Sequence, residues 1–257
     1  MEILVSSFVK GILIALRVSG IIFTAPIFNM RAIPNRAKLL LAILITYIVF
    51  FMVPNVNPAL NDNLMMLAVA GLKEMMIGII IGFAMNFIFY GISFAGLLLG
   101  YDMGLMIAQM FDPTTDSQSN IVGQTLLIIG ILVFIVMNGH HFVIQSIGYS
   151  FKLIPVGFYP VNETVYKLLE KYSAGIFILA IKISSPILVS FFLVDVGAGI
   201  IARVIPQMNV FFVVQPLKIE LGLVLIVFVI PVYIYVIRDI LLNYEDKILV
   251  MIQNMGL

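Results

Sequence analysis

The chain has 257 residues, of which 62% are hydrophobic and 11% are charged, and it contains no cysteine and no tryptophan. Soluble domains are about 45–50% apolar and about 25% charged, so this chain lacks the polar residues that would cover a surface facing water. Its 14 Lys and Arg against 13 Asp and Glu leave a net charge of +1, without the basic excess of a nucleic-acid binder. Long unbroken apolar runs favour membrane helices over the alternating strands of a barrel.

Seven apolar segments follow one another along the chain, at about 3–28, 37–56, 64–111, 121–137, 142–154, 174–205 and 210–237. The charge-free run 75–101 predicts a helix of about 40 Å, which is long enough to span a bilayer. Several other segments carry charges, each of which costs about 2.5–3.5 kcal/mol at the centre of a simple membrane span. We therefore expect these charges to face a protein interior or a water-filled path, or the segments not to be true spans.

Eleven prolines are expected to stop or kink helices, so the chain is predicted to be an all-α integral membrane protein of bent and broken helical hairpins. Irregular backbone at membrane depth is tolerated only where protein or a water-filled cavity surrounds it. The stretch 155–173 is expected to be a connector with a short amphipathic turn after Asn162. The stretch 238–253 has apolar residues at helical spacing, which predicts an amphipathic helix at the membrane interface or on a partner.

Glycines recur at a spacing of four residues, as in Gly78/Gly82 and Gly96/Gly100. This spacing allows the backbones of two helices to approach closely. It is also common in membrane helices of many functions, so it predicts close helix contacts without indicating a specific function.

No motif predicts catalysis, and we expect neither enzyme activity nor a cofactor. His140 and His141 are adjacent, so they would point to different faces of a helix, and no HExxH motif accompanies them. They are better explained as a polar turn at a helix end. Neither a nucleophile elbow nor a pair of carboxylates at matching depth occurs.

Four charges, Glu74, Lys182, Asp195 and Arg203, have no evident partner within their own segments. On one straight helix Lys182 and Asp195 would lie about 20 Å apart, so they could not pair. Each therefore needs a partner on another helix, on another subunit or in water. They could mark an ion or substrate pathway, but structural pairing within an assembly is the favoured interpretation.

The stretch 112–120 is the most polar in the chain and follows an apolar lead-in with several methionines. Met106, Met110 and Phe111 are apolar enough to exclude water from a narrow channel. Asp112 and Pro113 then predict a turn. The stretch could plug a channel, or it could be an ordinary hairpin loop.

A second polar break follows Arg203. Pro206 cannot continue a helix, and the side chains of Gln207 and Asn209 can satisfy the broken backbone. We expect a polar turn here that docks onto a neighbouring chain.

Taken together, these features resemble the FliR family of flagellar biosynthesis proteins, which has counterparts in virulence type III secretion. The likeness runs in order along nearly the whole chain, through Arg17, Thr24–Phe28, Ala32–Arg36, Glu74 with Gly78 and Gly82-Phe83, Gly104-Leu105 to Asp112-Pro113, Asn138–His141, Pro155, Pro186, Gly197–Arg203 and Pro206–Phe211. The Pro-Gln-Met-Asn-Val-Phe box at 206–211 is its most specific part. The flagellar branch looks closer than the virulence branch.

The resemblance implies a single export-gate domain over 1–257, with a P-like part at about 1–160 and a Q-like part with a C-terminal amphipathic helix at about 161–257. It implies assembly with P-type and Q-type subunits and a B-type switch protein into a helical, cone-shaped gate, much of it raised out of the bilayer plane. That gate would pass unfolded flagellar proteins across the bacterial cytoplasmic (inner) membrane at the flagellar basal body, with the loop at 104–123 as its plug. Arg17 would be a structural contact.

Two rival functions remain open on the sequence. A virulence type III export gate would share the same pattern. A secondary transporter would also use broken helices and intramembrane charges, but it should show two corresponding halves and a midplane site, and we find no matching pair.

Overall fold

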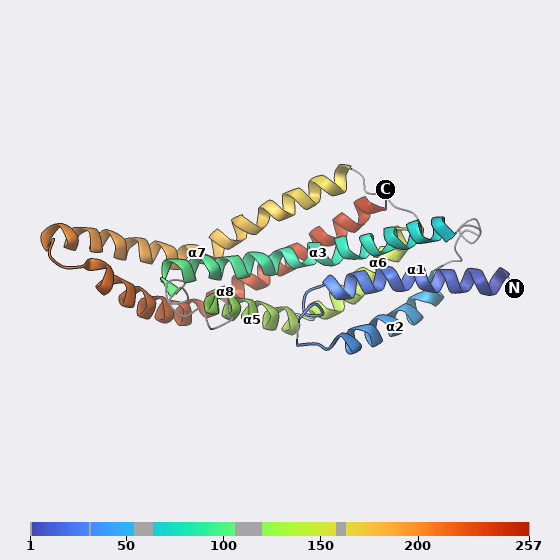
Figure 1. The fold of residues 1–257 in the computed structure, drawn as a ribbon, viewed down its shortest axis with the longest axis horizontal. Helices are drawn as coiled ribbons and strands as arrows, with labels where there is room; N and C mark the ends of the chain where they lie inside the picture. Colours follow the sequence, from blue (N-terminus) through green and yellow to red (C-terminus); the bar gives the residue numbers. More distant parts are fainter. Residues whose placement is uncertain (1, 31, 54–63, 106–119, 158–162, 257) are drawn as a thin grey trace. The chain divides into compact units, whose positions relative to one another are not determined.

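The computed structural model describes residues 2–30, 32–53, 64–105, 120–157 and 163–256. Within these ranges every regular element is an α-helix, which confirms the predicted fold class. The helices are α1 (Glu2–Thr24), α2 (Asn35–Met52), α3 (Leu64–Asp102), α5 (Ile121–Val136), α6 (Gly139–Leu153), α7 (Glu163–Val204) and α8 (Val210–Met255) (Figure 1). They agree with the apolar segments expected from the sequence, except that α7 and α8 are longer.

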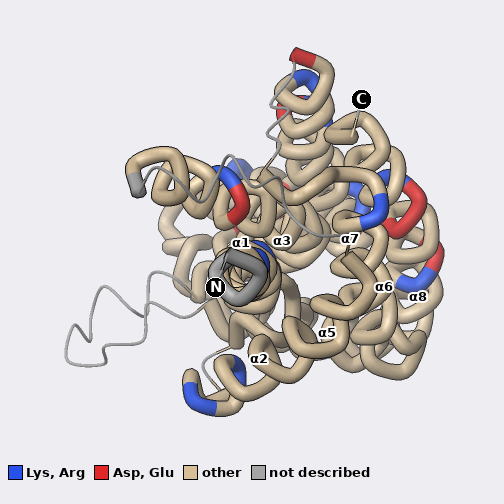
Figure 2. The backbone as a smooth tube through the Cα atoms, turned by 90° about the vertical axis from the view of Figure 1, so that its right-hand side faces the viewer, with Lys and Arg blue, Asp and Glu red and all other residues tan. Residues whose placement is uncertain are grey.

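Five of the described helices, α1, α2, α3, α7 and α8, are long and apolar enough to cross a membrane. Helices α5 and α6 meet at a bend of 69°, and as a pair they could form a sixth, broken span. The bend lies at Asn138, whose φ of 61° places it in the left-handed region that few non-glycine residues adopt. Charged residues occupy few positions along the backbone (Figure 2).

Three helices are much longer than a membrane is thick. Helices α3, α7 and α8 have 39, 42 and 46 residues, so each measures about 60–70 Å against a hydrocarbon layer of about 30 Å. Along the membrane normal, none of them fits wholly within that layer. Pro186, Pro216 and Pro231 lie inside α7 and α8 rather than at their ends.

The chain packs as two compact units, each built from separate pieces of sequence. Unit 1 comprises Met1–Phe87, Ile135–Tyr172 and Leu242–Leu257, and unit 2 comprises Ile88–Phe134 and Ser173–Leu241. Helices α3, α7 and α8 therefore each contribute to both units. The P-like and Q-like parts inferred from the family resemblance stay a prediction.

In unit 1, helices α1 and α3 approach backbone to backbone. A Cβ atom built on Gly78 would collide with the carbonyl oxygen of Arg17 and lie 3.0 Å from Cα of Gly20. One turn further along α3, a Cβ atom on Gly82 would collide with the side chain of Thr24. The close contact predicted for the Gly78/Gly82 pair is thus confirmed.

The last turns of α8 also belong to unit 1. Ile248, Met251, Ile252 and Met255 are each 0% exposed, and the hydroxyl of Tyr244 donates a hydrogen bond to the carbonyl of Ala84. This stretch is therefore the end of a long helix whose apolar face is covered by its own chain. It differs from the interfacial or partner-binding helix expected at 238–253, because those apolar residues already have neighbours within unit 1. Likewise, the expected connector at 155–173 is helical from Glu163 onward.

In unit 2, glycines again allow close packing around α3. A Cβ atom on Gly96 would collide with the backbone of Gly123 in α5. One on Gly91 would collide with the side chain of Leu179 in α7. The predicted close contact for the Gly96/Gly100 spacing is confirmed at Gly96.

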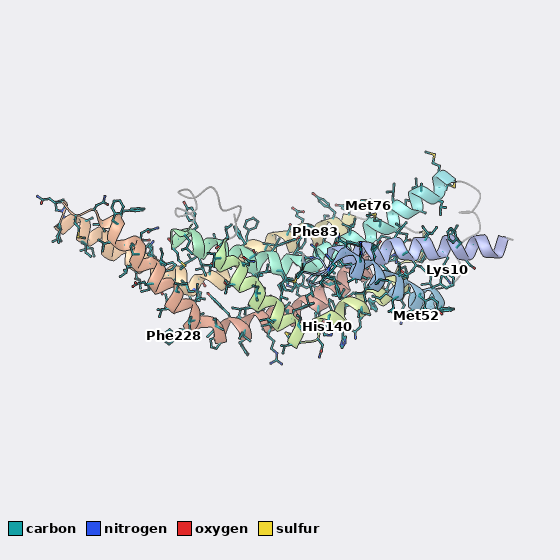
Figure 3. The ribbon with its side chains drawn as sticks, turned by 60° about the horizontal axis from the view of Figure 1, so that its bottom comes forward. Lys10, Met52, Met76, Phe83, His140 and Phe228 are labelled. Carbon is teal, nitrogen blue, oxygen red and sulfur yellow. The ribbon has the colours of Figure 1, made fainter. Side chains whose placement is uncertain are left out.

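Large apolar side chains remain exposed on α2, α7 and α8. Met52 is 72% exposed and Phe228 75% exposed (Figure 3). A soluble protein rarely exposes such a continuous apolar surface, so lipid or other proteins must cover it.

We expect Gly78→Ala to destabilise the isolated protein in detergent by about 1–3 kcal/mol, because the added methyl group meets backbone atoms that cannot move aside cheaply. The matched control is Gly175→Ala in α7, where a Cβ atom would meet nothing within 4 Å. The midpoint of thermal unfolding should fall for Gly78→Ala and should hold or rise for Gly175→Ala. Equal midpoints for the two variants would contradict the backbone contact.

Candidate functional site

The first polar cluster is a fully buried ion pair in unit 1. Nε of Arg17 in α1 lies 2.5 Å from Oε2 of Glu74 in α3, and both side chains are 0% exposed. The Arg17 guanidinium also lies 4.3 Å from the ring centroid of Phe151. The structure thus supplies Glu74 with a partner on another helix of the same chain.

Backbone groups at the end of α6 complete this cluster. Nη1 of Arg17 donates hydrogen bonds to the carbonyl oxygens of Ser150 and Ile154, at 3.1 and 3.0 Å. Oε1 of Glu74 accepts a hydrogen bond from the amide of Gly157 at 2.7 Å. The Ser150 carbonyl also accepts a hydrogen bond from the amide of Ile154, whereas the Ile154 carbonyl lies past the last residue of α6, where carbonyls lack a partner within the helix. One ion pair therefore joins α1, α3 and the end of α6.

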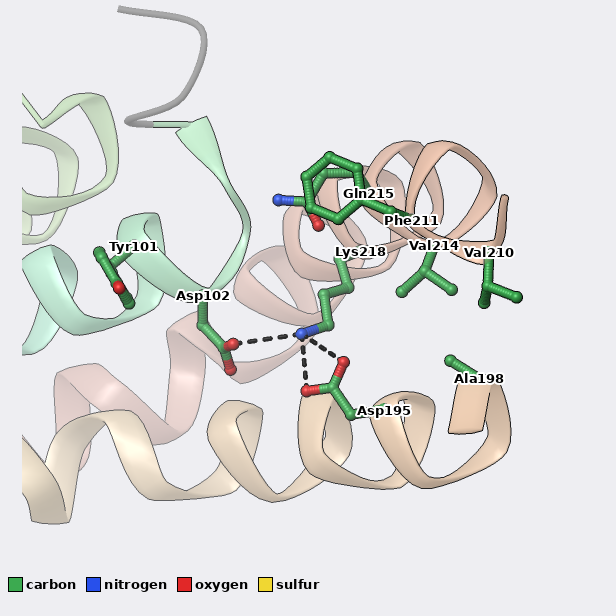
Figure 4. A pocket seen from close by; sticks show the side chains of 9 residues that line it. All are labelled: Tyr101, Asp102, Asp195, Ala198, Val210, Phe211, Val214, Gln215 and Lys218. Carbon is green, nitrogen blue, oxygen red and sulfur yellow. Dashed lines mark hydrogen bonds and ion pairs between the residues drawn. The ribbon is translucent and has the colours of Figure 1, made fainter. Parts of the chain in front are cut away.

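The second polar cluster lies in unit 2 and centres on Lys218 of α8 (Figure 4). Nζ of Lys218 lies 2.7 and 2.8 Å from the two carboxylate oxygens of Asp195 in α7, and 3.2 Å from Oδ1 of Asp102 at the end of α3. The Lys218 side chain is 7% exposed. The ammonium group has three N–H donors, so these three oxygens can use all of them.

A pocket of about 410 Å³ lies beside this cluster. Its apolar wall consists of Ala198, Val210, Phe211 and Val214, and Tyr101 and Gln215 complete the lining (Figure 4). Two carboxylates surround one cation, so the cluster as a whole carries a net negative charge.

Asp195 thus pairs with a residue on another helix, which is one of the three kinds of partner expected from the sequence. Lys182 and Arg203 differ, because both are exposed and form no ion pair with any residue that the structure describes. Of the four charges without evident partners, two are therefore satisfied within the chain. Of these four charges, Lys182 and Arg203 are the two whose partners must be water, lipid headgroups or another subunit.

The predicted break after Arg203 is present. Helix α7 ends at Val204 and α8 begins at Val210, and the amide of Met208 donates a hydrogen bond to the carbonyl of Ile205 at 3.1 Å. Pro206, Gln207 and Asn209 are exposed in this turn. The polar turn is confirmed, and its docking onto a neighbouring chain stays a prediction.

The proposed seal residues Met106, Met110 and Phe111, with Asp112 and Pro113, lie outside the described residues. The structure does describe the residues on either side of them. Gly104 has a φ of +73° and packs against the side chain of Gln215. After the gap, Asn120 packs between Gly100 and Gly123.

The pairing partners could not be read from the sequence. Lys218 stands out there as a cation in an apolar run, but nothing in the sequence connects it with Asp102, 116 residues away. The amide of Gly157 and the carbonyls of α6 carry no sequence signal at all. Within the described residues, no three His, Cys, Asp or Glu side chains gather where they could hold a metal ion.

We expect Arg17→Ala or Glu74→Ala to destabilise the protein by about 3–5 kcal/mol each, because each change leaves a buried charge without its partner. Lys167→Ala is the matched control, since the Lys167–Glu163 ion pair is exposed and such pairs contribute about 0–1 kcal/mol. Thermal unfolding in detergent measures all three. The double variant should cost less than the sum of the single changes, and additive losses would mean that the pair is not coupled.

Comparison with known proteins places this chain in a family. The family model described as "Bacterial export proteins, family 1" matches residues 8–244. The chain is 30% identical to the flagellar biosynthetic protein FliR of Bacillus subtilis (strain 168) over 93% of each chain. It is 32% identical to FliR of Pectobacterium carotovorum over 84% of this chain and 82% of that one.

FliR of Escherichia coli (strain K12) is 30% identical over 84% of this chain and 82% of its own length. The range of the family model extends across both units and includes the positions of Arg17, Glu74, Asp102, Asp195 and Lys218. The chain therefore belongs to the FliR family of bacterial flagellar export proteins.

Proposed function

We propose that this chain is a non-enzymatic subunit of the flagellar type III export gate. In this role it lines and plugs the conduit through which unfolded flagellar proteins leave the cytoplasm. The observation that carries the proposal is the match to FliR proteins along nearly the whole chain, at about 30% identity. Because the relatives reported above are flagellar proteins, the flagellar system is favoured over a virulence system.

The distribution of polar and apolar groups supports an assembled subunit. Among the described residues, the two charged side chains that are 0% exposed, Arg17 and Glu74, pair with each other inside the chain, and the buried Lys218 pairs with Asp195. By contrast, only 28% of the most apolar window of α7 and 17% of that of α8 are buried within the chain. A protein that worked alone would expose these long surfaces entirely to lipid. In a subunit of an assembly, neighbouring helices would cover part of these surfaces. The length of α7 and α8, which exceeds the thickness of the membrane, also favours an assembly.

The partners that we propose are the other components of the export apparatus, namely P-type and Q-type membrane subunits and a B-type switch protein. The turn at 205–209 is a suitable docking element, because its polar groups are exposed between two apolar helix ends. Lys182 and Arg203 would contact acidic or polar groups of those subunits. The assembly would lie in the cytoplasmic membrane at the flagellar basal body.

The plug that we propose is the loop within 104–123. A resting conduit must block ions, yet it must open for an unfolded chain, and a loop has fewer packed contacts to lose than a helix. Met106, Met110 and Phe111 would form the apolar seal. The flanking residues Gly104 and Asn120 are both packed within unit 2, so the two ends of the loop are held by the same unit.

Deleting residues 110–118 should raise the small-ion permeability of cells or reconstituted complexes, because two of the three seal residues, Met110 and Phe111, are removed while helices α3 and α5 stay intact. The triple change Met106→Ser, Met110→Ser, Phe111→Ser should have the same effect. The control Thr114→Ala, Thr115→Ala, Ser117→Ala alters only polar residues of the same loop and should leave permeability at the wild-type level. Wild-type permeability of a normally assembled deletion variant would rule out the plug.

Lys182→Ala combined with Arg203→Ala should lower the recovery of assembled complex, since both cations lack a partner in the described part of the chain. The measurement is the amount of partner subunit that co-purifies in mild detergent. Lys167→Ala removes a cation from an exposed ion pair and serves as the control. Full assembly with both alanines present would count against a role for these charges in subunit contacts.

A further inference from the structure

We infer that Lys218 is a positioning residue that holds the end of α3 against helices α7 and α8. It thereby fixes the point at which the chain leaves α3 for the loop that follows. The consequence for ion leakage rests on the plug assignment of the proposed function. The positioning itself rests only on residues that the structure describes.

The contacts of Lys218 connect three helices through one buried group. Its ammonium nitrogen binds both carboxylate oxygens of Asp195 and one oxygen of Asp102. The Asp195 side chain is 51% exposed and the Asp102 side chain 31% exposed, whereas that of Lys218 is 7% exposed. If the contacts were broken, water could therefore solvate the partly exposed carboxylates more easily than the buried ammonium group.

Asp102 is the residue through which this cluster acts on α3, because it is the last residue of that helix. Without the lysine, Asp102 and Asp195 would face each other as two like charges on neighbouring helices. Their repulsion would push the end of α3 away from α7. With the lysine in place, the same two charges draw the helix end inward.

The residues directly after Asp102 are also held in place, so the position of the end of α3 determines where the following chain begins. Met103 is 0% exposed, and the amide of Gly104 donates a hydrogen bond to the carbonyl of Tyr101 at 2.9 Å. The positive φ of Gly104 is that of a glycine that ends a helix. A Cβ atom there would collide with the side chain of Gln215, one helical turn from Lys218.

One face of α8 thus holds both Asp102 and Gly104, through Lys218 and Gln215. The other flank of the loop is held differently. A Cβ atom on Gly100 would lie 2.5 Å from Oδ1 of Asn120, and one on Gly123 would lie 2.8 Å from its Nδ2. The position of that flank depends on the close packing of Asn120 rather than on an ion pair, so Lys218 positions one flank of the loop only.

The test uses the assembled export complex and a single cysteine introduced as Leu105→Cys, which is possible because the chain has no cysteine of its own. The rate of labelling by a water-soluble maleimide reports how firmly this position is held. Asp102→Asn removes a charge and retains the shape, and it should raise the labelling rate at least threefold. Asp195→Asn should have a smaller effect, because the Lys218–Asp102 contact remains. Lys218→Arg should stay near the parent rate, because it retains the cation.

Ion permeability of the same variants gives the second readout, and Asp102→Asn should raise it. An unchanged labelling rate for Asp102→Asn in a normally assembled complex would overturn the inference. Loss of assembly in Asp102→Asn would also overturn it, since a contact that only positions one helix end should not be needed for the fold. If labelling rises but deletion of 110–118 causes no leak, the positioning role stands and the plug assignment fails.

Discussion

The ion pair between Arg17 and Glu74 satisfies the strictest physical requirement in this chain. A charge that is fully buried in apolar surroundings must be paired and must have its remaining hydrogen-bonding groups satisfied. Arg17 is paired with one carboxylate and donates to two backbone carbonyls, although its Nη2 is buried without a partner among the described residues, and Glu74 is held by one guanidinium and one amide. These contacts set the relative positions of α1, α3 and α6 within unit 1, and the glycine contacts between α1 and α3 depend on the same arrangement.

Unit 2 also contains a buried charge that is paired, but the residues around it are less buried than those of the Arg17–Glu74 pair. Lys218 is enclosed, but its two carboxylate partners remain partly exposed, so this cluster is open to water or to neighbouring proteins on one side. The contrast fits a protein with two different tasks. In unit 1 the charges stabilise the fold, whereas in unit 2 they lie where helix α3 ends, next to the segment that we propose as the plug.

The sequence predicted the fold class, the apolar helices and the break at 205–209, because hydrophobic runs, glycine spacing and proline act locally along the chain. It predicted that each proline stops or kinks a helix, but not which of the two occurs, and Pro186, Pro216 and Pro231 lie inside α7 and α8. It identified Glu74 and Asp195 as charges that need partners. Their partners, Arg17 and Lys218, lie on other helices, and the sequence does not show which residues of different helices meet. Choosing between partners required the tertiary structure. The buried face at the end of α8 was misjudged for the same reason, since the pattern of an amphipathic helix does not say what covers its apolar side.

The most direct test of the central claim, that this chain is a subunit of the flagellar export gate, is to purify it from its native membrane in mild detergent and to identify co-eluting chains by mass spectrometry. Our account predicts a stable complex that contains P-type and Q-type export subunits in amounts that do not vary between preparations. Elution of the chain alone, as a stable and homogeneous species without other export components, would contradict it.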